Sequence, residues 1–129
     1  MDAAAALAEL TELSSQVRRA VVLGTDGSLL GSTDAGAEAT QELARSALEA
    51  VAAAGELHAS AEVTRVEVEL AEGALFVLHE GGRTIAATTG PDPTAGLVVY
   101  DLRTCLHGID QEKPKRRRSP RKPKPEEAG

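Results

Sequence analysis

Aromatic side chains are almost absent from this sequence. Phe76 and Tyr100 are the only two, and there is no tryptophan. Proteins that bind single-stranded nucleic acid usually stack the bases on several aromatic rings, so a binding surface of that kind is not expected. Hydrophobic residues still make up 42% of the 129 residues, which is enough for one core built from alanine, valine and leucine.

Cysteine is nearly absent as well, since Cys105 is the only one. A single cysteine excludes an internal disulfide and a multi-cysteine metal cluster, and it agrees with a reducing compartment, so we expect a cytoplasmic location. No apolar run approaches the ~20 residues that a membrane-spanning helix needs. The first residues, MDAAAALAEL, also lack the basic region and long apolar stretch of a secretory signal. We expect neither export nor membrane insertion.

Lysine does not occur before residue 113. Residues 113–129 hold eight basic and two acidic residues, a charge of +6, whereas residues 1–112 hold 6 basic and 18 acidic residues, a charge of −12. The tail also contains several prolines and no aliphatic residue except Ala128, so it cannot build a core. We therefore predict a folded acidic domain over residues 1–110 and a disordered basic tail over residues 111–129.

The first third of the domain predicts a helix followed by a hairpin. Apolar residues recur at helical spacing in residues 2–15, and the same spacing continues to Val17. Residues 20–23 and 29–32 are typical strands, and Asp26-Gly27 between them accepts the positive φ angles of a tight hairpin turn. The predicted helical stripe consists of Ala6, Leu10, Leu13 and Val17.

Residues 37–54 predict the longest helix, because strong helix formers dominate them. Gly55 follows directly, and a glycine there is expected to end the helix with a left-handed cap. Glu42, Arg45 and Glu49 are expected to form charge pairs along another face of this helix. The stripe that faces the core is expected to contain Leu43, Ala47, Val51 and Ala54.

Residues 62–89 change to a period of two, which predicts three antiparallel strands at 62–70, 74–79 and 83–89. In the first of these, Thr64, Val66, Val68 and Leu70 form one face, which we expect to be half-buried.

The Gly90-Pro91-Asp92-Pro93 segment is expected to break the sheet and lead into a last helix, with Asp92 a candidate cap and Pro93 suited to the first helical position. Its apolar stripe is expected to contain Val98, Leu102, Cys105 and Ile109, and to pack on the sheet.

Residue types that carry catalysis are few and scattered. Residues 24–33, GTDGSLLGST, contain glycines but lack the lysine of a phosphate-binding loop. His58, His79 and His107 show none of the spacings of a zinc site, which favours surface histidines over metal ligands. Cys105 lies on an apolar stripe, which favours a core position over a nucleophile. We expect no enzymatic activity, no metal and no cofactor.

The acidic side chains Glu67 and Glu69 alternate with apolar residues and point to the opposite face of their strand. A solvated face is the favoured interpretation, and a docking surface for an arginine-bearing partner is the alternative.

Four segments together resemble the Roadblock family, which includes dynein light chains, lysosomal scaffold subunits and bacterial regulators of small GTPases. The segments are AVVLGTDGSLL, EATQELARSALEAVAAAGEL, VEVELAEGALFVLHEGGRTIAATTG and GLVVYDLRTCL, and the resemblance covers residues 3–109. It consists of hydrophobic patterns and glycine turns rather than catalytic motifs. It implies a Roadblock/profilin-like α+β fold in the order α-β-β-α-β-β-β-α, with a five-stranded antiparallel sheet, the long helix on one face and the terminal helices on the other.

The resemblance also implies a dimer, either with a second copy or with a paralogue. In such a dimer the central helices of the two subunits pack together, and the strands that follow these helices pair. In this chain the helix is residues 37–54 and the strand is residues 62–70. A long alternating strand with a free edge agrees with such pairing. The expected interface residues are Arg45, Leu48, Ala52, Val63, Arg65 and Glu67.

Bacterial members of the family often look like partners of a small Ras-like GTPase, sometimes beside a sensor kinase. The resemblance therefore implies a non-catalytic adaptor or regulator in bacterial signalling. Arg18, Arg19 and Arg45 are the candidates for an arginine finger, and an ordinary surface role is favoured for each. The alternative function is binding of nucleic acid or an anionic surface through the tail. The tail residues expected to carry it are Lys115, Arg116, Arg117, Arg118, Arg121, Lys122 and Lys124.

Overall fold

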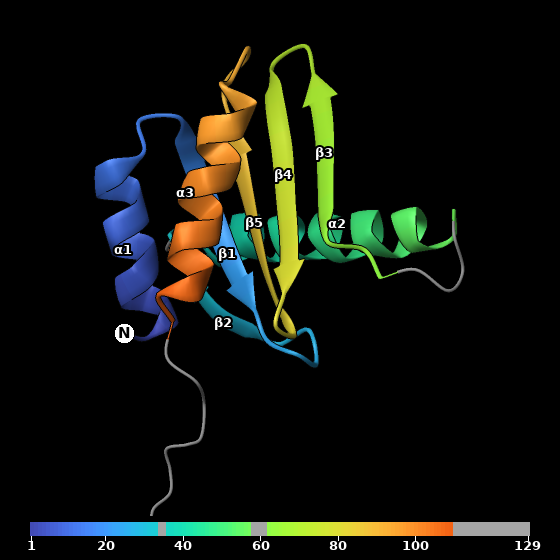
Figure 1. The fold of residues 1–129 in the computed structure, drawn as a ribbon, viewed down its shortest axis with the longest axis horizontal. Helices are drawn as coiled ribbons and strands as arrows, with labels where there is room; N and C mark the ends of the chain where they lie inside the picture. The colour runs from blue at the N-terminus through green and yellow to red at the C-terminus, as the bar shows by residue number, and fades with distance from the viewer. Residues whose placement is uncertain (34–35, 58–61, 110–129) are drawn as a thin grey trace, which may run out of the picture.

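The computed structural model describes residues 1–33, 36–57 and 62–109 of the chain (Figure 1). The predicted tail, 111–129, lies outside the described residues, and so do His58 and the predicted boundary at residue 110.

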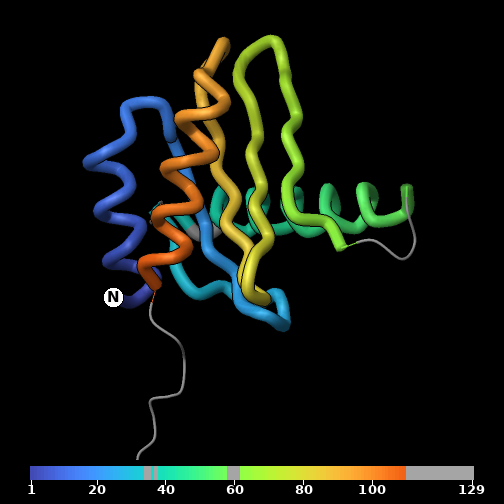
Figure 2. Tube along the Cα trace, viewed as in Figure 1, coloured from blue at the N-terminus to red at the C-terminus, as the bar shows by residue number. Residues whose placement is uncertain are grey.

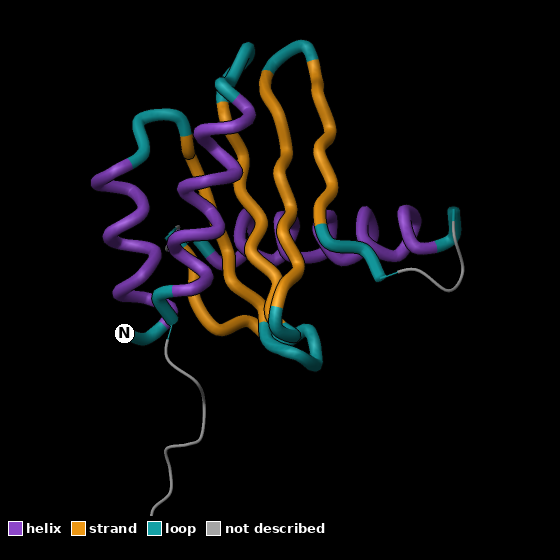
Figure 3. Tube along the Cα trace, in the orientation of Figure 1, coloured by secondary structure: helices purple, strands orange, loops and turns teal. Residues whose placement is uncertain are grey.

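In the part of the chain that the structure describes, three helices and five strands follow one another in the predicted order, and the fold is α+β (Figure 3). All strand pairs are antiparallel, and the strands lie in the sheet in the order β2-β1-β5-β4-β3. The elements are α1 (Ala3–Leu13), β1 (Val17–Leu23), β2 (Leu29–Ser32), α2 (Ala37–Gly55), β3 (Arg65–Leu70), β4 (Gly73–Glu80), β5 (Arg83–Thr89) and α3 (Ala95–His107).

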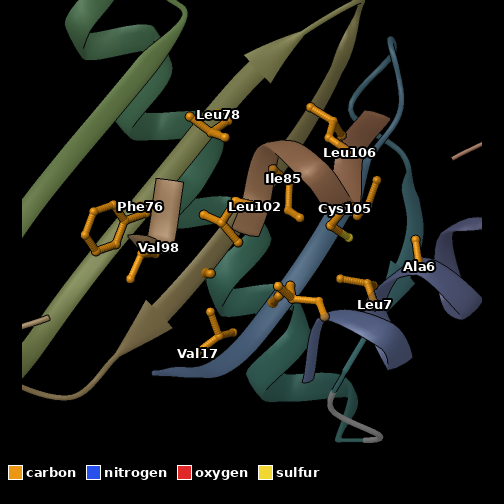
Figure 4. Close-up of a cluster of buried hydrophobic side chains, with 14 of the residues drawn as sticks. Ala6, Leu7, Val17, Phe76, Leu78, Ile85, Val98, Leu102, Cys105 and Leu106 are labelled. Atoms are coloured by element: carbon orange, nitrogen blue, oxygen red, sulfur yellow. The ribbon is translucent and has the colours of Figure 1, made fainter. Parts of the chain in front are cut away.

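The sheet separates two layers of helices, as expected. Helices α1 and α3 cover one face, and α2 crosses the other face (Figure 1). The larger core fills the α1 and α3 side, where Leu7, Ile85 and Leu102 are fully buried (Figure 4). The smaller core lies under α2 and contains Val21, Leu43, Ala47, Val77 and Ala86. Both faces of the sheet are therefore covered, but unequally.

Two tight turns carry glycines in the left-handed backbone conformation. Gly27 has a φ of 83° in the β1–β2 turn, which confirms the hairpin predicted at Asp26-Gly27. Gly81 and Gly82 have φ angles of 61° and 80° between β4 and β5, as a two-residue hairpin turn of this type requires.

The end of α1 differs from the prediction. Leu13 is the last helical residue and is exposed, and Val17 already belongs to β1. Ser14 explains the change, because its backbone N–H donates to Leu10 while its buried hydroxyl oxygen accepts from the N–H of Val17 at 3.3 Å. The predicted stripe from Ala6 to Val17 was therefore wrong in its last two members.

The predicted left-handed cap at Gly55 was also wrong. The helix continues through Gly55, and Glu56 caps it in a right-handed helical conformation, with its N–H directed to the carbonyls of Ala53 and Ala54. Such bonds tighten the last turn and satisfy the final carbonyls without a positive φ.

The start of α3 lies later than predicted, because Thr94 is its N-cap and Ala95 its first residue. Asp92 is not a cap; it has a φ of 56° in the preceding turn, and Pro93 precedes the helix. The backbone N–H of Thr94 donates to Gln16 Oε1 at 2.6 Å, which ties this turn to the start of β1.

Candidate protein-interaction surface

The outer side of β3 is an open sheet edge. β3 pairs with β4 from Arg65 opposite Leu78 to Leu70 opposite Gly73, and it is the last strand of the sheet. Within the described residues no strand lies beyond it. Every second backbone N–H and C=O of β3 therefore faces outward, as a template for another strand.

The other edge of the sheet is closed to such pairing. β2 has only four residues, and α1 packs against it. Gly31 of β2 lies so close to this helix that an added Cβ would be 3.2 Å from the Cβ of Ala3. Short length and a covering helix are common ways of protecting an edge strand. The two edges therefore differ, and β3 is the one available to a partner.

The apolar face of β3 is less buried than predicted. Val66 packs against the small core beside α2, but Val68 is 36% exposed and Leu70 is 61% exposed. The prediction of a half-buried face was wrong for these two residues, because the strand lies at the rim of the sheet. They were not among the interface residues expected from the sequence, although the apolar alternation that marks them was visible there.

The opposite face of β3 is charged. Arg65, Glu67 and Glu69 lie opposite Leu78, Phe76 and Ala74 of β4, respectively, and all three are exposed. Arg65 Nε is 3.2 Å from Glu67 Oε2, an ion pair between neighbours on the same face. An exposed pair of this kind contributes little to the stability of the monomer, so both groups remain available to a partner strand.

Helix α2 supplies the second part of the surface. In the views of Figures 1 and 2 its C-terminal part runs past β3, beyond the edge of the sheet. Leu48 is 42% exposed, and Arg45 and Ala52 are exposed near it on the helix. Arg45 makes no ion pair within the described residues, so the predicted charge pairs with Glu42 and Glu49 do not form.

The predicted interface residues divide between the two faces of this edge. Val63 lies just before β3, and its Cγ2 is 3.6 Å from the position that a Cβ on Gly55 would occupy, so it packs on the end of α2. Val66 shows that even-numbered residues of β3 face α2, and Arg65 and Glu67 therefore lie on the other face. A strand that paired with β3 would contact both groups at once.

Among the described residues, the groups with possible chemistry are not assembled into a reactive site. His79 Nδ1 is 2.8 Å from Thr84 Oγ1, and His107 lies at the end of α3. Cys105 is a free, buried thiol in the core, as expected, and burial raises its pKa to about 11, with a smaller contribution from the Glu9 carboxylate. In the described ranges no three histidine, cysteine or carboxylate side chains are grouped to hold a metal ion.

The candidate arginines are also apart. Arg18 and Arg19 are exposed on β1, and Arg45 lies on α2. The Arg18 side chain lies against Gly90, since a Cβ built on Gly90 would be 2.7 Å from Arg18 Nη2.

Across the described residues, no helix is both long and apolar enough to cross a membrane. The positively charged tail residues predicted to bind polyanions lie outside the described part of the chain.

One polar cluster fixes α3 to the sheet. Glu80, at the end of β4, accepts from Arg103 Nε at 2.9 Å and lies 2.8 Å from His107 Nε2. The hydrogen bonds from His107 and Arg103 lower the pKa of Glu80 below the usual carboxyl value. The cluster holds the last turns of α3 in position, so we assign it a structural role.

Comparison with known proteins is informative at the level of structure. No family model matches the sequence, and no curated protein matches it significantly. A crystal structure of a Roadblock/LC7 domain from Streptomyces avermitilis matches with a TM-score of 0.71 at 21% identity, over 83% of this chain and 93% of that one. Myxococcus xanthus MglB matches with a TM-score of 0.67 at 19% identity, over 81% and 89%. MglB with tetrameric arrangement matches with a TM-score of 0.60 at 17% identity, over 81% and 85%.

The sheet order, the helix on one face and the helix pair on the other define an α+β protein of the same architecture as these structures. The chain has the Roadblock/LC7 fold. The predicted resemblance to the Roadblock family is thus confirmed at the level of the fold, and MglB is among the structures with this fold.

Proposed function

We propose that this protein is a non-catalytic, dimeric adaptor that binds and regulates a small Ras-like GTPase in a bacterial signalling system. The observation that carries the proposal is the open edge of β3, where Val68 and Leu70 remain exposed on the face of the sheet that α2 crosses. An unpaired strand edge with apolar side chains favours pairing with another strand. We also propose a cytoplasmic location, since the single cysteine is a free thiol.

In the proposed dimer, the β3 strands of two subunits pair antiparallel, and the two sheets become one. The second subunit is another copy of this chain or a paralogue. Because α2 runs past the edge of β3, the α2 of each subunit extends over the edge strand of the other. This arrangement covers Leu70, Val68 and the flank of α2 that carries Leu48. Burial of one exposed leucine side chain is worth about 1.5–3 kcal/mol, so the four β3 side chains alone favour association substantially.

The charges of β3 select one register for a pair of identical strands. Directly opposed residues share a face of the sheet. In a symmetric pair of identical strands, the two-fold axis must therefore lie between one residue and its own copy, and we name the axis by that residue. An axis at Val66 places Arg65 opposite Glu67 of the other strand, twice. An axis at Glu67 opposes this glutamate to its own copy, and an axis at Val68 opposes Glu67 to Glu69. We therefore propose the register centred on Val66, which brings only opposite charges together.

The GTPase part of the proposal is supported by the fold and by the family resemblance described above. In the dimer, the outward faces of the two α2 helices form a continuous charged platform on one side of the sheet. Glu42, Arg45 and Glu49 are exposed there, and Arg45 is free of ion pairs within the described residues. Such a surface fits the polar, conformationally variable loops of a GTPase better than a small-molecule ligand. A sensor kinase is a further expected partner in the same system.

Capture of a GTPase tests the proposal. A small Ras-like GTPase encoded beside this gene should be retained by the immobilised protein, and it should still be retained when residues 113–129 are deleted. Substitution Glu42→Lys on α2, outside the expected dimer interface, should weaken retention at least tenfold, whereas Glu72→Lys in the exposed β3–β4 turn should not. If the tail-deleted protein retains no such GTPase, the proposed function is wrong.

The tail supports a second candidate function, contact with nucleic acid or another polyanion. Its eight basic residues give it a charge of +6. If all eight met phosphates of duplex DNA, the slope of log K against log salt concentration would be about −7. Deletion of residues 113–129 should abolish this binding, and a salt slope near zero would exclude it.

A further inference from the structure

A groove opens between α1 and α3, on the opposite side of the sheet from α2. It has a volume of about 170 Å³. Ala6, Leu10 and Cys105 are buried and form its floor, and Leu13 and Tyr100 belong to its walls. The floor is therefore apolar, and it is continuous with the larger core.

The walls of this groove are the most exposed large apolar side chains of the helix pair. Leu13 is 70% exposed and Tyr100 is 66% exposed. Leu97, one turn before Tyr100 on α3 and outside the lining of the groove, is 50% exposed. Exposed leucines are ordinary when they are scattered, but an apolar floor between two exposed apolar walls is a typical docking site for a hydrophobic anchor.

The rim of the groove is acidic. Glu9 of α1 and Asp101 of α3 line it, together with Thr104, and no basic residue does. Neither carboxylate makes an ion pair within the described residues. The two basic side chains of α3, Arg103 and His107, are held by Glu80 at the sheet and not at the groove. The potential over the groove is therefore negative, which favours a positively charged partner.

We propose that the α1–α3 groove is a docking site for an amphipathic helix of another protein, with aliphatic residues along one side and lysine or arginine residues flanking them. A groove between two packed helices accepts the side-chain ridge of a third helix. Aliphatic side chains spaced three or four residues apart would fill the floor and contact Leu13 and Tyr100. The flanking cations would meet Glu9 and Asp101.

Two other occupants fit less well. A second copy of the domain has few cations to meet Glu9 and Asp101, because residues 1–112 hold only 6 basic residues against 18 acidic ones. The chain's own tail has the right charge, but residues 111–127 contain no aliphatic side chain to cover Leu13 or Leu97. A partner helix with both cations and aliphatic anchors satisfies both properties of the site.

This site does not depend on the proposed dimer. Pairing through β3 and α2 leaves the α1 and α3 side of each subunit open, so a dimer would carry two such grooves. Loss of the dimer and loss of groove binding are measured separately.

A designed peptide provides the test. The probe is a fluorescein-labelled helical peptide of about 15 residues, with leucines at positions i, i+4, i+7 and i+11 and lysines on both sides of that stripe. The matched control peptide carries glutamate at every lysine position. Binding to the full chain is measured by fluorescence polarisation, and sedimentation velocity reports the oligomeric state of each sample.

The expected dissociation constant for the lysine peptide is on the order of 10 μM, and the glutamate peptide should bind at least tenfold more weakly. Leu13→Ser and Tyr100→Ala should each weaken binding by about tenfold. Both side chains are exposed, so the fold should be retained, and circular dichroism checks this. Leu29→Ser, at an exposed leucine of β2, is the matched control and should leave binding unchanged.

The proposal is overturned if the lysine peptide does not bind, if the glutamate peptide binds equally well, or if Leu13→Ser and Tyr100→Ala leave its affinity unchanged. It is also overturned in favour of the chain's own tail if deletion of residues 111–129 raises the affinity tenfold and a synthetic 111–129 peptide displaces the probe.

Discussion

Val68 and Leu75 lie directly opposite each other in the β3–β4 ladder, yet they differ in their surroundings. Leu75 packs against the core beneath α2, whereas Val68 is 36% exposed. Val66 of β3 still packs on this core, so the covered part of the sheet ends between these two strands only at the Val68 end of β3. Beyond that line the apolar pattern of β3 continues without a cover, and the proposed dimer interface begins there.

The proposed register predicts a specific result for charge exchange on β3. Arg65→Glu should weaken the dimer about tenfold or more, because it replaces two attractive cross-strand pairs with two repulsive ones, each worth roughly 0.2–1 kcal/mol. The double variant Arg65→Glu, Glu67→Arg should restore the wild-type dissociation constant, as measured by sedimentation equilibrium. If Arg65→Glu is instead rescued by Glu69→Arg, the register is centred on Glu67.

Gly73 is predicted to be intolerant of any side chain. A Cβ there would collide with the backbone carbonyl oxygen of Thr89 on the neighbouring strand. Gly73→Ala should therefore lower the free energy of unfolding by about 2 kcal/mol, through strain at a packed position. Gly96→Ala is the control, because nothing lies within 4 Å of its added Cβ, and a helical alanine should be neutral or stabilising. Urea unfolding of both variants checks this, and equal effects would contradict it.

The Glu80 cluster predicts a pH-dependent contribution to stability. Because the pKa of Glu80 is lowered in the folded state, its contribution is present above the unfolded value of about 4.3 and is lost as the pH falls through the folded value. Glu80→Gln should lower the melting temperature by about 3 °C at pH 6, as expected for a partly exposed cluster worth less than ~1 kcal/mol.

The difference between Glu80→Gln and wild type should shrink below pH 4, where the carboxyl becomes protonated. Glu72→Gln, at an exposed turn residue, should show no difference at either pH. A destabilisation by Glu80→Gln that stays constant from pH 6 to the acid range would contradict the role of the ionised carboxylate.

Cys105 is predicted to be an unreactive thiol in the folded protein. Its pKa of about 11 leaves roughly 0.1% as thiolate at pH 8, and the side chain is 6% exposed. Alkylation by iodoacetamide at pH 8 should therefore be at least ~100-fold slower in the native protein than in urea, where the thiol regains an ordinary pKa near 8.5. A native rate within tenfold of the unfolded rate would contradict a core position.

Local chemistry explains why much of the fold was predictable from the sequence. The Asp26-Gly27 pair defines its hairpin because few residues accept a positive φ, and Gly27 adopts one. The stripe with Leu102 and Cys105 identifies the buried side of α3, because helical spacing places these residues together.

The errors have non-local causes. The end of α1 at Leu13 depends on Ser14, whose hydroxyl oxygen accepts a hydrogen bond from the N–H of Val17 at the start of β1. A hydrophobic pattern does not reveal such a bond. In the interaction surface, the exposure of Leu70 likewise could not be predicted from the sequence pattern. Its alternation with charged residues predicts a strand, but its exposure depends on which strand lies at the edge and on where α2 crosses the sheet.

The most direct test of the central claim is sedimentation equilibrium of the protein with and without residues 113–129, at about 1–100 μM. Both forms should be dimers with the same dissociation constant, and Leu70→Asp should weaken association at least ~100-fold, because it places a charge in an apolar interface. Leu29→Asp, at the closed β2 edge, should not. A wild-type protein that remains monomeric at 100 μM, or a dimer that Leu70→Asp leaves unchanged, would contradict assembly through the β3 edge.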